Sequence, residues 1–298
     1  MEQIKIVILD AATLGKDVDL SVFDSLGEVT AYDLTDRESI KERIADCDVC
    51  VINKVRLDGE VLSEAKELKL ICVAATGFDN IDTEFCRKNG IALCNVAGYS
   101  VNSVSQLTVA MVLSASVNLD AFRNSVADGS YSKGSVQNIL TPVYHEIAGK
   151  TWGIIGYGQI GKKVGDVAKA LGCKLIVNKR TPIEGEECVS LDEILTRSDI
   201  ITIHTPLSAE TRNLIGEAEI AKMKDGVILL NFARDQLVDE EAVVASIEAG
   251  KVRRYVSDFP NSTVAGKKGC ITTPHLGAST AESEINCAKM AVKEVMEF

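Results

Sequence analysis

Short apolar runs alternate with amphipathic stretches along most of this chain. In its first third, the runs that are typical of buried strands lie at 4–9, 49–53, 70–74 and 91–94. A helical pattern, from Asp58 to Glu67, lies between two of these runs. Strands that alternate with helices indicate a parallel sheet that is covered on both faces.

A second alternating series begins near residue 150. It predicts strands at 152–155, 174–178, 199–203, 226–231, 253–257 and 270–272. It predicts helices at 159–171, 191–197, 217–224 and 239–249, and a last helix that begins near Thr280. Each alternating series predicts one doubly wound α/β domain. The last helix is expected to pack with the first series, so the second domain is inserted into the first. Residues 99–274 form one domain, which is inserted into a domain made of residues 1–98 and 275–298.

Residues 89–119 carry no charged side chain. The part from Val101 to Leu119 is expected to be helical, and its many polar side chains argue against a membrane span. The spacing of Ser103 and Gln106 fits a capping box, which marks the start of a helix in water. We expect this helix to be buried between domains or subunits, and residues 128–149 to form a loop.

Composition excludes several classes of function. The chain has 298 residues, 46% of them hydrophobic, and a formal net charge of −11, which argues against nucleic acid as a main partner. The apolar run Ile4–Leu9 is too short for a signal peptide. Nine cysteines show no repeating spacing, so Cys47 and Cys50 are expected to pack as reduced thiols and no metal site is expected. A reducing cytoplasm is the expected compartment.

Gly156, Gly158 and Gly161 form a GxGxxG pattern between an apolar strand and an amphipathic helix. In that setting Gly156 permits a tight turn, Gly158 lets the backbone approach a pyrophosphate, and Gly161 lets helix and strand pack closely. The helix N-terminus adds free N–H groups for phosphates. The pattern therefore predicts a Rossmann domain that binds a dinucleotide, with incidental glycines in a turn as the alternative.

The second strand of this unit ends in Asn178, Lys179, Arg180 and Thr181. An acidic residue there would accept hydrogen bonds from the ribose hydroxyls and would repel a 2′-phosphate, whereas two cations and a hydroxyl suit a phosphate. This favours NADP(H) over NAD(H), which stays possible. The alternative is that Lys179 and Arg180 are only a solvated pair.

Five stretches resemble the signatures of the D-isomer-specific 2-hydroxyacid dehydrogenases. They are LICVAATGFDNID at 70–82, the glycine-rich segment at 151–161, SDIITIHTPL at 198–207, LNFARDQLVDE at 230–240 and TPHLGAST at 273–280. The resemblance implies a flavodoxin-like substrate domain and an enzyme that acts on a small 2-keto or 2-hydroxy acid. Residues 51–55 and 95–106 look most like glycerate dehydrogenases and hydroxypyruvate reductases, whereas 255–260 looks more like phosphoglycerate dehydrogenases.

Reduction of a 2-keto acid needs a hydride donor, a cation for the carboxylate and carbonyl oxygen, and a proton donor for the forming alkoxide. Arg234 follows an apolar strand, at the carboxyl edge where doubly wound sheets bind ligands, and its guanidinium can bind a carboxylate through two hydrogen bonds. The alternative is an exposed strand-end arginine. The resemblance makes His275 the general acid in reduction and the base in oxidation.

The family pairs its catalytic histidine with a glutamate, which orients the ring and raises its pKa. Residues 259–274 contain no acidic residue, and by counting, Thr263 stands in the place of the glutamate. His275 is therefore expected to be less basic than in relatives, or else another carboxylate supplies the charge.

The resemblance also assigns contacts with ligands. Asp258 is expected to contact the nicotinamide carboxamide. Lys54, Thr76 and Gly77 are expected to bind the substrate carboxylate, with a merely solvated lysine as the alternative for Lys54. His204 is expected to pack beside the cofactor. The remaining expected cofactor contacts are Gln159, Ile160, Thr205, Pro206, Thr211, Phe232, Ala233 and Gly277.

These features together predict a reductase of hydroxypyruvate or glyoxylate that forms a D-2-hydroxy acid and assembles as a homodimer. A phosphoglycerate dehydrogenase is one alternative. Another is a nucleotide-sensing protein with weak or no turnover, which the absent glutamate keeps open. No nucleic-acid or membrane partner is expected.

Overall fold

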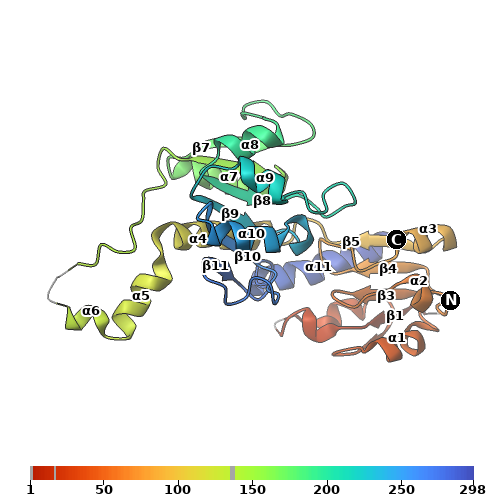
Figure 1. The fold of residues 1–298 in the computed structure, drawn as a ribbon. Helices are drawn as coiled ribbons and strands as arrows, with labels where there is room; N and C mark the ends of the chain where they lie inside the picture. The colour runs from red at the N-terminus through yellow and green to blue at the C-terminus, as the bar shows by residue number, and fades with distance from the viewer. Residues whose placement is uncertain (1–2, 17, 135–137) are drawn as a thin grey trace. The chain divides into compact units, whose positions relative to one another are not determined.

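The computed structural model describes residues 3–16, 18–134 and 138–298 (Figure 1). The chain divides into two compact units, of which the first comprises Met1–Ser100 with Ala278–Phe298 and the second comprises Val101–Gly277. The sequence placed the boundaries at 98/99 and 274/275, so His275, assigned there to the first domain, lies in the second unit. The physical reason is a set of hydrogen bonds from the His275 loop to Asp258, described below.

The first unit contains a five-stranded parallel sheet in the order β2-β1-β3-β4-β5. Its strands are β1 (Lys5–Ile8), β2 (Glu28–Ala31), β3 (Val49–Ile52), β4 (Leu70–Val73) and β5 (Ala92–Asn95). Its helices are α1 (Arg37–Ile44), α2 (Gly59–Leu62), α3 (Thr83–Asn89) and α11 (Ala281–Glu297), with 3₁₀ turns at Ala11–Thr13 and Leu20–Phe23.

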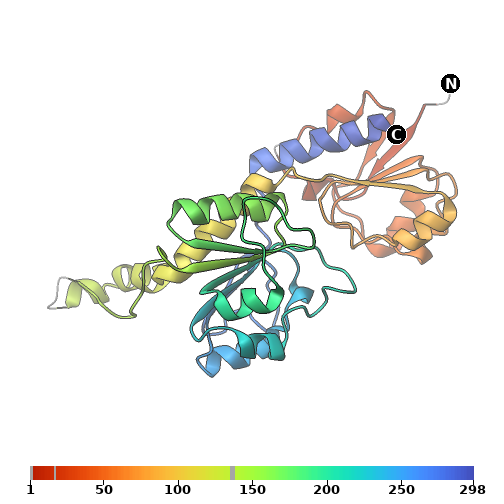
Figure 2. The ribbon, with the colours of Figure 1, turned by 90° about the horizontal axis from the view of Figure 1, so that it is seen from above.

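Successive residues of β1 pack on opposite faces of this sheet. Ile6 and Ile8 belong to the same hydrophobic cluster as Ala291 of α11, whereas Val7 belongs to the cluster that contains Ile44 of α1. This alternation is what a period of two residues in a strand requires when helices cover both faces. Figure 2 shows α11 on one side of the sheet.

The second unit contains a six-stranded parallel sheet in the order β11-β10-β9-β8-β6-β7. Its strands are β6 (Thr151–Ile155), β7 (Lys174–Asn178), β8 (Ile200–Ile203), β9 (Val227–Asn231), β10 (Val252–Ser257) and β11 (Cys270–Thr272). A parallel bridge between Val177 and Cys188 extends the sheet beyond β7. Counted along the chain from that bridge, the bridge and the strands β7, β6, β8, β9 and β10 follow the order 3-2-1-4-5-6 of a Rossmann sheet, and β11 adds a seventh position beside β10.

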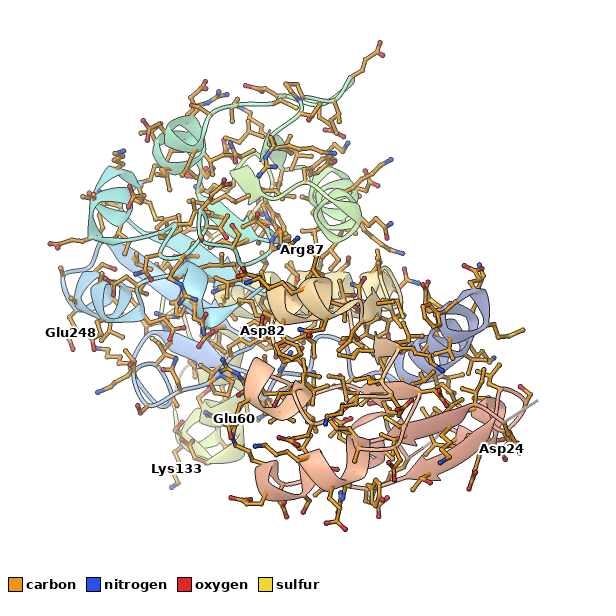
Figure 3. The ribbon with its side chains drawn as sticks, turned by 90° about the vertical axis from the view of Figure 1, so that its right-hand side faces the viewer. Asp24, Glu60, Asp82, Arg87, Lys133 and Glu248 are labelled. Atoms are coloured by element: carbon orange, nitrogen blue, oxygen red, sulfur yellow. The ribbon has the colours of Figure 1, made fainter. Side chains whose placement is uncertain are left out.

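Helices cover both faces of the second sheet as well. One face carries α4 (Val101–Val117) and α7 (Gln159–Ala170), and the other carries α8 (Leu191–Arg197), α9 (Glu217–Lys222) and α10 (Glu240–Glu248). The predicted α/β fold with two parallel sheets is therefore confirmed. Charged side chains such as Asp24, Arg87 and Glu248 lie exposed on their units (Figure 3).

Three local predictions were wrong. Strand β2 was not predicted, because it is an edge strand with no fully buried residue and so has a weak apolar pattern. The helix expected from Asp58 to Glu67 ends at Leu62, after which Glu64 and Ala65 donate to carbonyls three residues back. The capping box expected at Ser103 is absent, because the helix begins at Val101 and Ser103 lies within its first turn.

The region after α4 contains two helices that were not predicted. Helix α5 (Leu119–Ala127) follows α4 directly and has no buried residue, and the short helix α6 (Ser130–Lys133) lies within the loop expected at 128–149. Residues 135–137 of the expected loop lie outside the described residues. Among the described residues no single helix is long and apolar enough to cross a membrane; α4 and α5 pass that test only as a pair, and they are bent by 68°.

Candidate active site

The glycine-rich turn after β6 lies against the loop that follows β8. Gly156 has φ of +89°. A Cβ on this residue would lie 2.5 Å from the Thr205 nitrogen and 2.6 Å from the His204 carbonyl carbon. A Cβ on Gly161 would lie 2.5 Å from the Gly156 carbonyl oxygen. Both positions therefore require glycine, because backbone atoms fill the space that a side chain would occupy.

Gly158 differs from the other two glycines, because no atom lies within 4 Å of its Cβ position. It caps helix α7 without a side-chain hydrogen bond, and the first turn of the helix holds no acidic residue. Gln159 is exposed and Ile160 is partly buried beside it. The N–H groups at the start of this 12-residue helix are therefore open to an anion.

His204 directly follows β8 and is partly buried beside this turn, with both of its ring nitrogens buried. Neither of its ring nitrogens has a hydrogen-bond partner among the described residues. Burial lowers its pKa to about 4, so the ring is neutral at physiological pH. Buried polar atoms that lack a partner are rare in folded proteins and point to a bound group. The glycine turn can accept the pyrophosphate of a dinucleotide, and the ring nitrogens of His204 are available to hydrogen-bond to the same ligand.

The loop that carries Thr205, Pro206 and Thr211 is folded on itself. The Thr211 hydroxyl donates to the Pro206 carbonyl at 2.8 Å, and the Ser208 nitrogen donates to the Thr211 hydroxyl at 2.7 Å. Glu210 in this loop forms an ion pair with Arg180 at 3.4 Å. The loop thus brings an acid to the basic end of β7.

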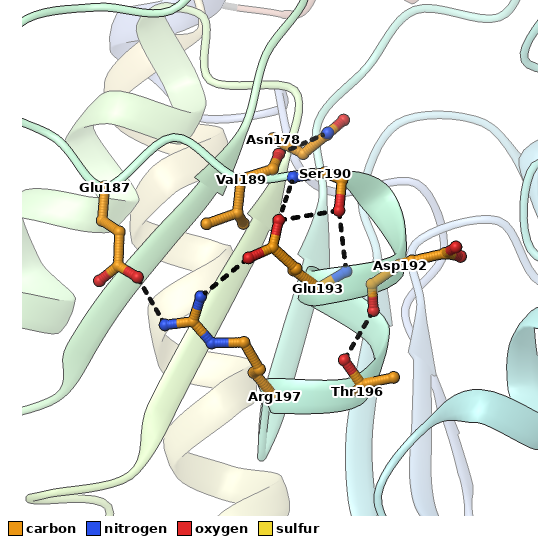
Figure 4. Close-up of polar contacts among 8 residues, drawn as sticks. All are labelled: Asn178, Glu187, Val189, Ser190, Asp192, Glu193, Thr196 and Arg197. Carbon is orange, nitrogen blue, oxygen red and sulfur yellow. Dashed lines mark hydrogen bonds and ion pairs between the residues drawn. The ribbon is translucent and has the colours of Figure 1, made fainter.

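At the end of β7, Asn178 does not project toward a ligand. Its side-chain nitrogen donates to the Val189 carbonyl at 3.0 Å, just before the capping box that starts α8 (Figure 4). Lys179, Arg180 and Thr181 are exposed. Because the side chains of both Arg180 and Glu210 are at least 80% exposed, their ion pair is weak and leaves the guanidinium able to bind another anion.

Arg234 is placed by the residue that ends β9. The fully buried Asn231 accepts a hydrogen bond from the Ala233 nitrogen at 3.2 Å and donates one to the Arg234 carbonyl at 2.7 Å. Arg234 is half-buried, and one of its terminal nitrogens donates to the Ala233 carbonyl at 2.8 Å. Phe232 is buried before it. The side-chain amide of Asn231 therefore fixes the turn from which Arg234 projects.

His275 lies in a loop that a single carboxylate holds. Asp258, only 2% exposed, accepts hydrogen bonds from the Thr273 hydroxyl at 2.6 Å, the Leu276 nitrogen at 2.8 Å and the Gly277 nitrogen at 2.7 Å. His275 itself is exposed and has φ of +55°, which is uncommon for a residue with a side chain. These hydrogen bonds keep the loop in that conformation and join it to the second unit.

Both expected catalytic side chains contact one aromatic ring, that of Phe259. The ring centroids of Phe259 and His275 lie 4.8 Å apart with the planes at 54°. The Arg234 guanidinium carbon lies 5.9 Å from the Phe259 centroid. Phe259 was not among the residues predicted from the sequence, although its position directly after Asp258 was a usable signal.

The loop that lacks the family's glutamate has a buried carboxylate at its base, which the sequence analysis also missed. Glu240 accepts hydrogen bonds from the Tyr255 hydroxyl and the Asn261 amide. Asn261 in turn accepts from the Thr263 nitrogen at 2.9 Å. Burial raises the pKa of Glu240, and this is the largest influence on it. Glu240 therefore supports the loop through Asn261.

In the first unit, Lys54 lies in a loop held by Asp10. This carboxylate, 2% exposed, accepts hydrogen bonds from the backbone nitrogens of Asn53, Lys54 and Val55. The side chain of Lys54 is exposed. After the neighbouring strand β4, the Thr76 hydroxyl donates to the Val96 carbonyl at 3.0 Å, and Gly77 follows. Lys54 and Thr76 thus follow adjacent strands of one sheet at their carboxyl ends.

The described residues contain no group of three His, Cys, Asp or Glu side chains arranged to hold a metal ion. The arrangement in the second unit instead combines a dinucleotide cradle, a guanidinium and an exposed imidazole on one sheet edge. Those groups suit hydride transfer to a carbonyl carbon with proton transfer to its oxygen.

Comparisons with known proteins point the same way. The sequence pattern described as "D-isomer specific 2-hydroxyacid dehydrogenase, NAD binding domain" matches residues 109–277. The hydroxypyruvate reductase of Blautia hydrogenotrophica is 35% identical over 99% of this chain and 96% of its own length. The glycerate dehydrogenase of Methylorubrum extorquens is 36% identical, with the same coverage of 99% and 96%.

Solved structures and longer relatives match as well. The D-lactate dehydrogenase of Aquifex aeolicus, solved with NAD and lactic acid, has a TM-score of 0.87 and 27% identity, covering 99% of this chain and 95% of that one. The D-3-phosphoglycerate dehydrogenase of Archaeoglobus fulgidus is 32% identical over 88% of this chain, which spans 51% of that protein.

Proposed function

We propose that this chain, which belongs to the D-isomer-specific 2-hydroxyacid dehydrogenase family, reduces hydroxypyruvate or glyoxylate to the D-2-hydroxy acid. Membership of the family makes it an oxidoreductase that acts on a CH–OH group with a nicotinamide dinucleotide. The observation that carries the proposal is the pairing of Arg234 and His275 on one ring, at the same edge of the sheet as the glycine turn.

The proposed roles follow from the chemistry of each group. Arg234 binds the substrate carboxylate and polarises the carbonyl oxygen, because a guanidinium offers two donors in one plane. His275 gives its proton to that oxygen as the alkoxide forms. Lys54, Thr76 and Gly77 add donors for the carboxylate. The nicotinamide, when bound, supplies the hydride.

The residues proposed to hold the cofactor lie in three loops of the second unit. The turn from Gly156 to Gly161 and the start of α7 bind the pyrophosphate. The loop after β8, with His204, Thr205, Pro206 and Thr211, and the turn with Phe232 and Ala233 line the rest of the site. Asp258 and Gly277 are placed beside the nicotinamide.

Turnover of a panel of 2-keto acids tests the substrate class. We expect hydroxypyruvate and glyoxylate to give the highest kcat/KM, and the product to be the D-isomer. A higher kcat/KM with 3-phosphohydroxypyruvate would favour the phosphoglycerate dehydrogenase alternative, which the match to such enzymes keeps in view. Tight dinucleotide binding without turnover of any of these acids would favour the sensor alternative.

We propose NADP(H) as the preferred cofactor. The inward hydrogen bond of Asn178 and the exposure of Lys179, Arg180 and Thr181 support this, because no acidic residue ends β7. We expect a higher kcat/KM with NADPH than with NADH, and Arg180→Ala should remove most of the difference. Lys174→Ala, an exposed cation at the other end of β7, is the matched control. An equal rate of the unmodified protein with NADH would contradict the proposal.

We propose a homodimer that works in the cytoplasm. The arm formed by α5, α6 and residues 138–146 extends from the sheet in Figures 1 and 2 and exposes Leu119, Val126, Leu140, Val143 and Tyr144. So much exposed apolar surface in one segment is typical of an interface. The molar mass from light scattering should be that of a dimer, and the double variant Val126→Glu, Leu140→Glu should dissociate into monomers more readily.

The nine free cysteines support the proposed location, because thiols stay reduced in a reducing compartment such as the cytoplasm.

A further inference from the structure

We propose that Phe259 is a positioning residue for the reaction, holding the imidazole of His275 and the guanidinium of Arg234 in one arrangement. The proposal rests on the function proposed above and adds a residue to which neither the sequence motifs nor the family resemblance assigned a role. Its basis is that one ring contacts both side chains, at 4.8 Å between centroids for His275 and 5.9 Å for the Arg234 guanidinium carbon.

The backbone that carries this ring is anchored. The Phe259 nitrogen donates to the Ser257 hydroxyl at 3.1 Å, and Ser257 is fully buried at the end of β10. The Ser257 carbonyl accepts from the Thr273 nitrogen at 3.0 Å, in the segment that leads into His275. Asp258, between Ser257 and Phe259, holds the residues that follow His275. Three consecutive residues thus hold the His275 loop and the ring that His275 contacts.

Hydrogen bonds to the backbone of this loop do not by themselves set the rotamer of the imidazole. Asp258 accepts from the Thr273 hydroxyl before His275 and from the Leu276 nitrogen after it, and neither hydrogen bond involves the imidazole, which belongs to an exposed residue. The ring of Phe259 restricts rotation of the imidazole through van der Waals contact. A displacement of about 1 Å in a reacting group can lower the rate by up to about a hundredfold, so this restriction matters for proton transfer.

The same ring limits the guanidinium. Arg234 has a long, flexible side chain, and its contacts with the Ala233 carbonyl and with the face of Phe259 reduce the number of rotamers that it samples. An aromatic ring orients both groups by packing and adds no charge, whereas the family's glutamate orients the histidine through a hydrogen bond. In this chain, where Thr263 replaces the glutamate, we assign part of the orienting function to Phe259.

Two substitutions distinguish the effect of the aromatic ring of Phe259 from the effect of its apolar volume. Phe259→Leu keeps apolar bulk but removes the flat faces, and we expect kcat to fall about tenfold and KM to rise several-fold, since both partners lose their support. Phe259→Tyr keeps the ring and should stay within about twofold of the unmodified protein on both constants. The dissociation constant for NADPH should not change in either variant. Phe298→Leu, the same change at the exposed last residue, is the control.

Histidine NMR gives a readout that does not depend on turnover. The chain has three histidines, so labelled His275 can be assigned by its loss in His275→Ala. Ring current from Phe259 should shift the His275 imidazole protons, and Phe259→Leu should move them while leaving His145 and His204 in place. Phe259→Tyr should leave all three in place.

The outcomes separate the proposal from the proposed function. His275 signals that do not respond to Phe259→Leu would overturn the contact. Signals that respond while kcat and KM stay unchanged would overturn the positioning role. If the protein reduces no 2-keto acid, the proposed function fails, and the NMR comparison still decides the contact. Should Phe259→Leu not fold, Phe259→Met provides the same test with a flexible apolar side chain.

Discussion

Asp10 in the first unit and Asp258 in the second are both 2% exposed, and each lies just beyond the end of a parallel strand. Each accepts hydrogen bonds from the loop after the neighbouring strand: Asp10 follows β1 and binds the loop after β3, and Asp258 follows β10 and binds the loop after β11. Each of these loops carries an expected active-site residue, Lys54 in one and His275 in the other.

The two loops differ in how the functional residue is held. Asp10 accepts from the Lys54 nitrogen itself and from the nitrogens on either side. Asp258 accepts from groups that flank His275, while the His275 nitrogen donates to the Thr273 carbonyl at 2.9 Å. A carboxylate that binds three successive N–H groups fixes the backbone of the loop in an ordinary conformation. A carboxylate that binds on both sides of a residue instead stabilises a left-handed turn, which projects the imidazole outward.

The largest expected effect tests whether the second loop carries the chemistry. His275→Ala should lower kcat by about 10²–10⁴-fold, because the alkoxide loses its proton donor. The dissociation constant for NADPH, measured by cofactor fluorescence, should stay unchanged. His145→Ala, which changes an exposed histidine, serves as the control. Near-normal reduction by His275→Ala would remove this loop from the mechanism.

Asp258→Asn tests the support of His275. An amide accepts through one atom only, so at least one buried donor from Thr273, Leu276 or Gly277 loses its acceptor, at a cost of about 1–3 kcal/mol. We expect the variant to have a lower midpoint of thermal unfolding, measured by circular dichroism, than the unmodified protein. We also expect a lower kcat at about 20 °C, where both proteins are folded. A lower midpoint with unchanged kcat would mean that the His275 loop keeps its active conformation without the hydrogen bonds to Asp258.

Asp10→Asn is the matching change in the first unit. It should lower the thermal midpoint for the same reason, by about as much. Its kinetic effect should differ, however: KM should rise with kcat little changed, because Lys54 is proposed to bind the carboxylate in the ground state as well. Lys54→Ala should raise KM similarly, and the double variant should be less than additive. A fall in kcat equal to that of Asp258→Asn would end the distinction between the loops.

Glu240 provides the smallest effect and a contrast with both aspartates, because it accepts from two side chains rather than from backbone. Its pKa is raised above 4.5 by burial, so the folded protein favours the protonated form. The stability that Glu240 contributes is therefore present below about pH 4.5 and is lost as the pH rises through its folded-state pKa. Glu240→Gln does not titrate, and its thermal midpoint relative to the unmodified protein should increase from pH 5 to pH 7, by about 2–4 °C per kcal/mol gained. A constant difference across that range would contradict the raised pKa.

Local chemistry was enough for much of the fold. The buried parallel strand Val49–Ile52 is a continuous apolar run, and Val227–Asn231 is apolar up to its last residue, so both stand out in the sequence. The glycine turn at Gly156 was readable because its spacing reflects a backbone requirement, and the close approach of His204 and Thr205 is the contact that imposes it. Edge strand β2 was not readable, since a strand with only one half-buried face has a weak pattern.

The tertiary structure alone decided how the functional loops are held. Asp10 and Lys54 are 44 positions apart, and Asp258 and Gly277 are 19 apart. Nothing in the residue types links them until adjacent parallel strands place their carboxyl ends side by side. The contact of Phe259 with both Arg234 and His275 has the same origin. Sequence by itself determined which chemical groups this protein has at the ends of its strands, because strands and turns follow local pattern. Their pairing depended on which strands become neighbours, and that is settled only when the sheets assemble.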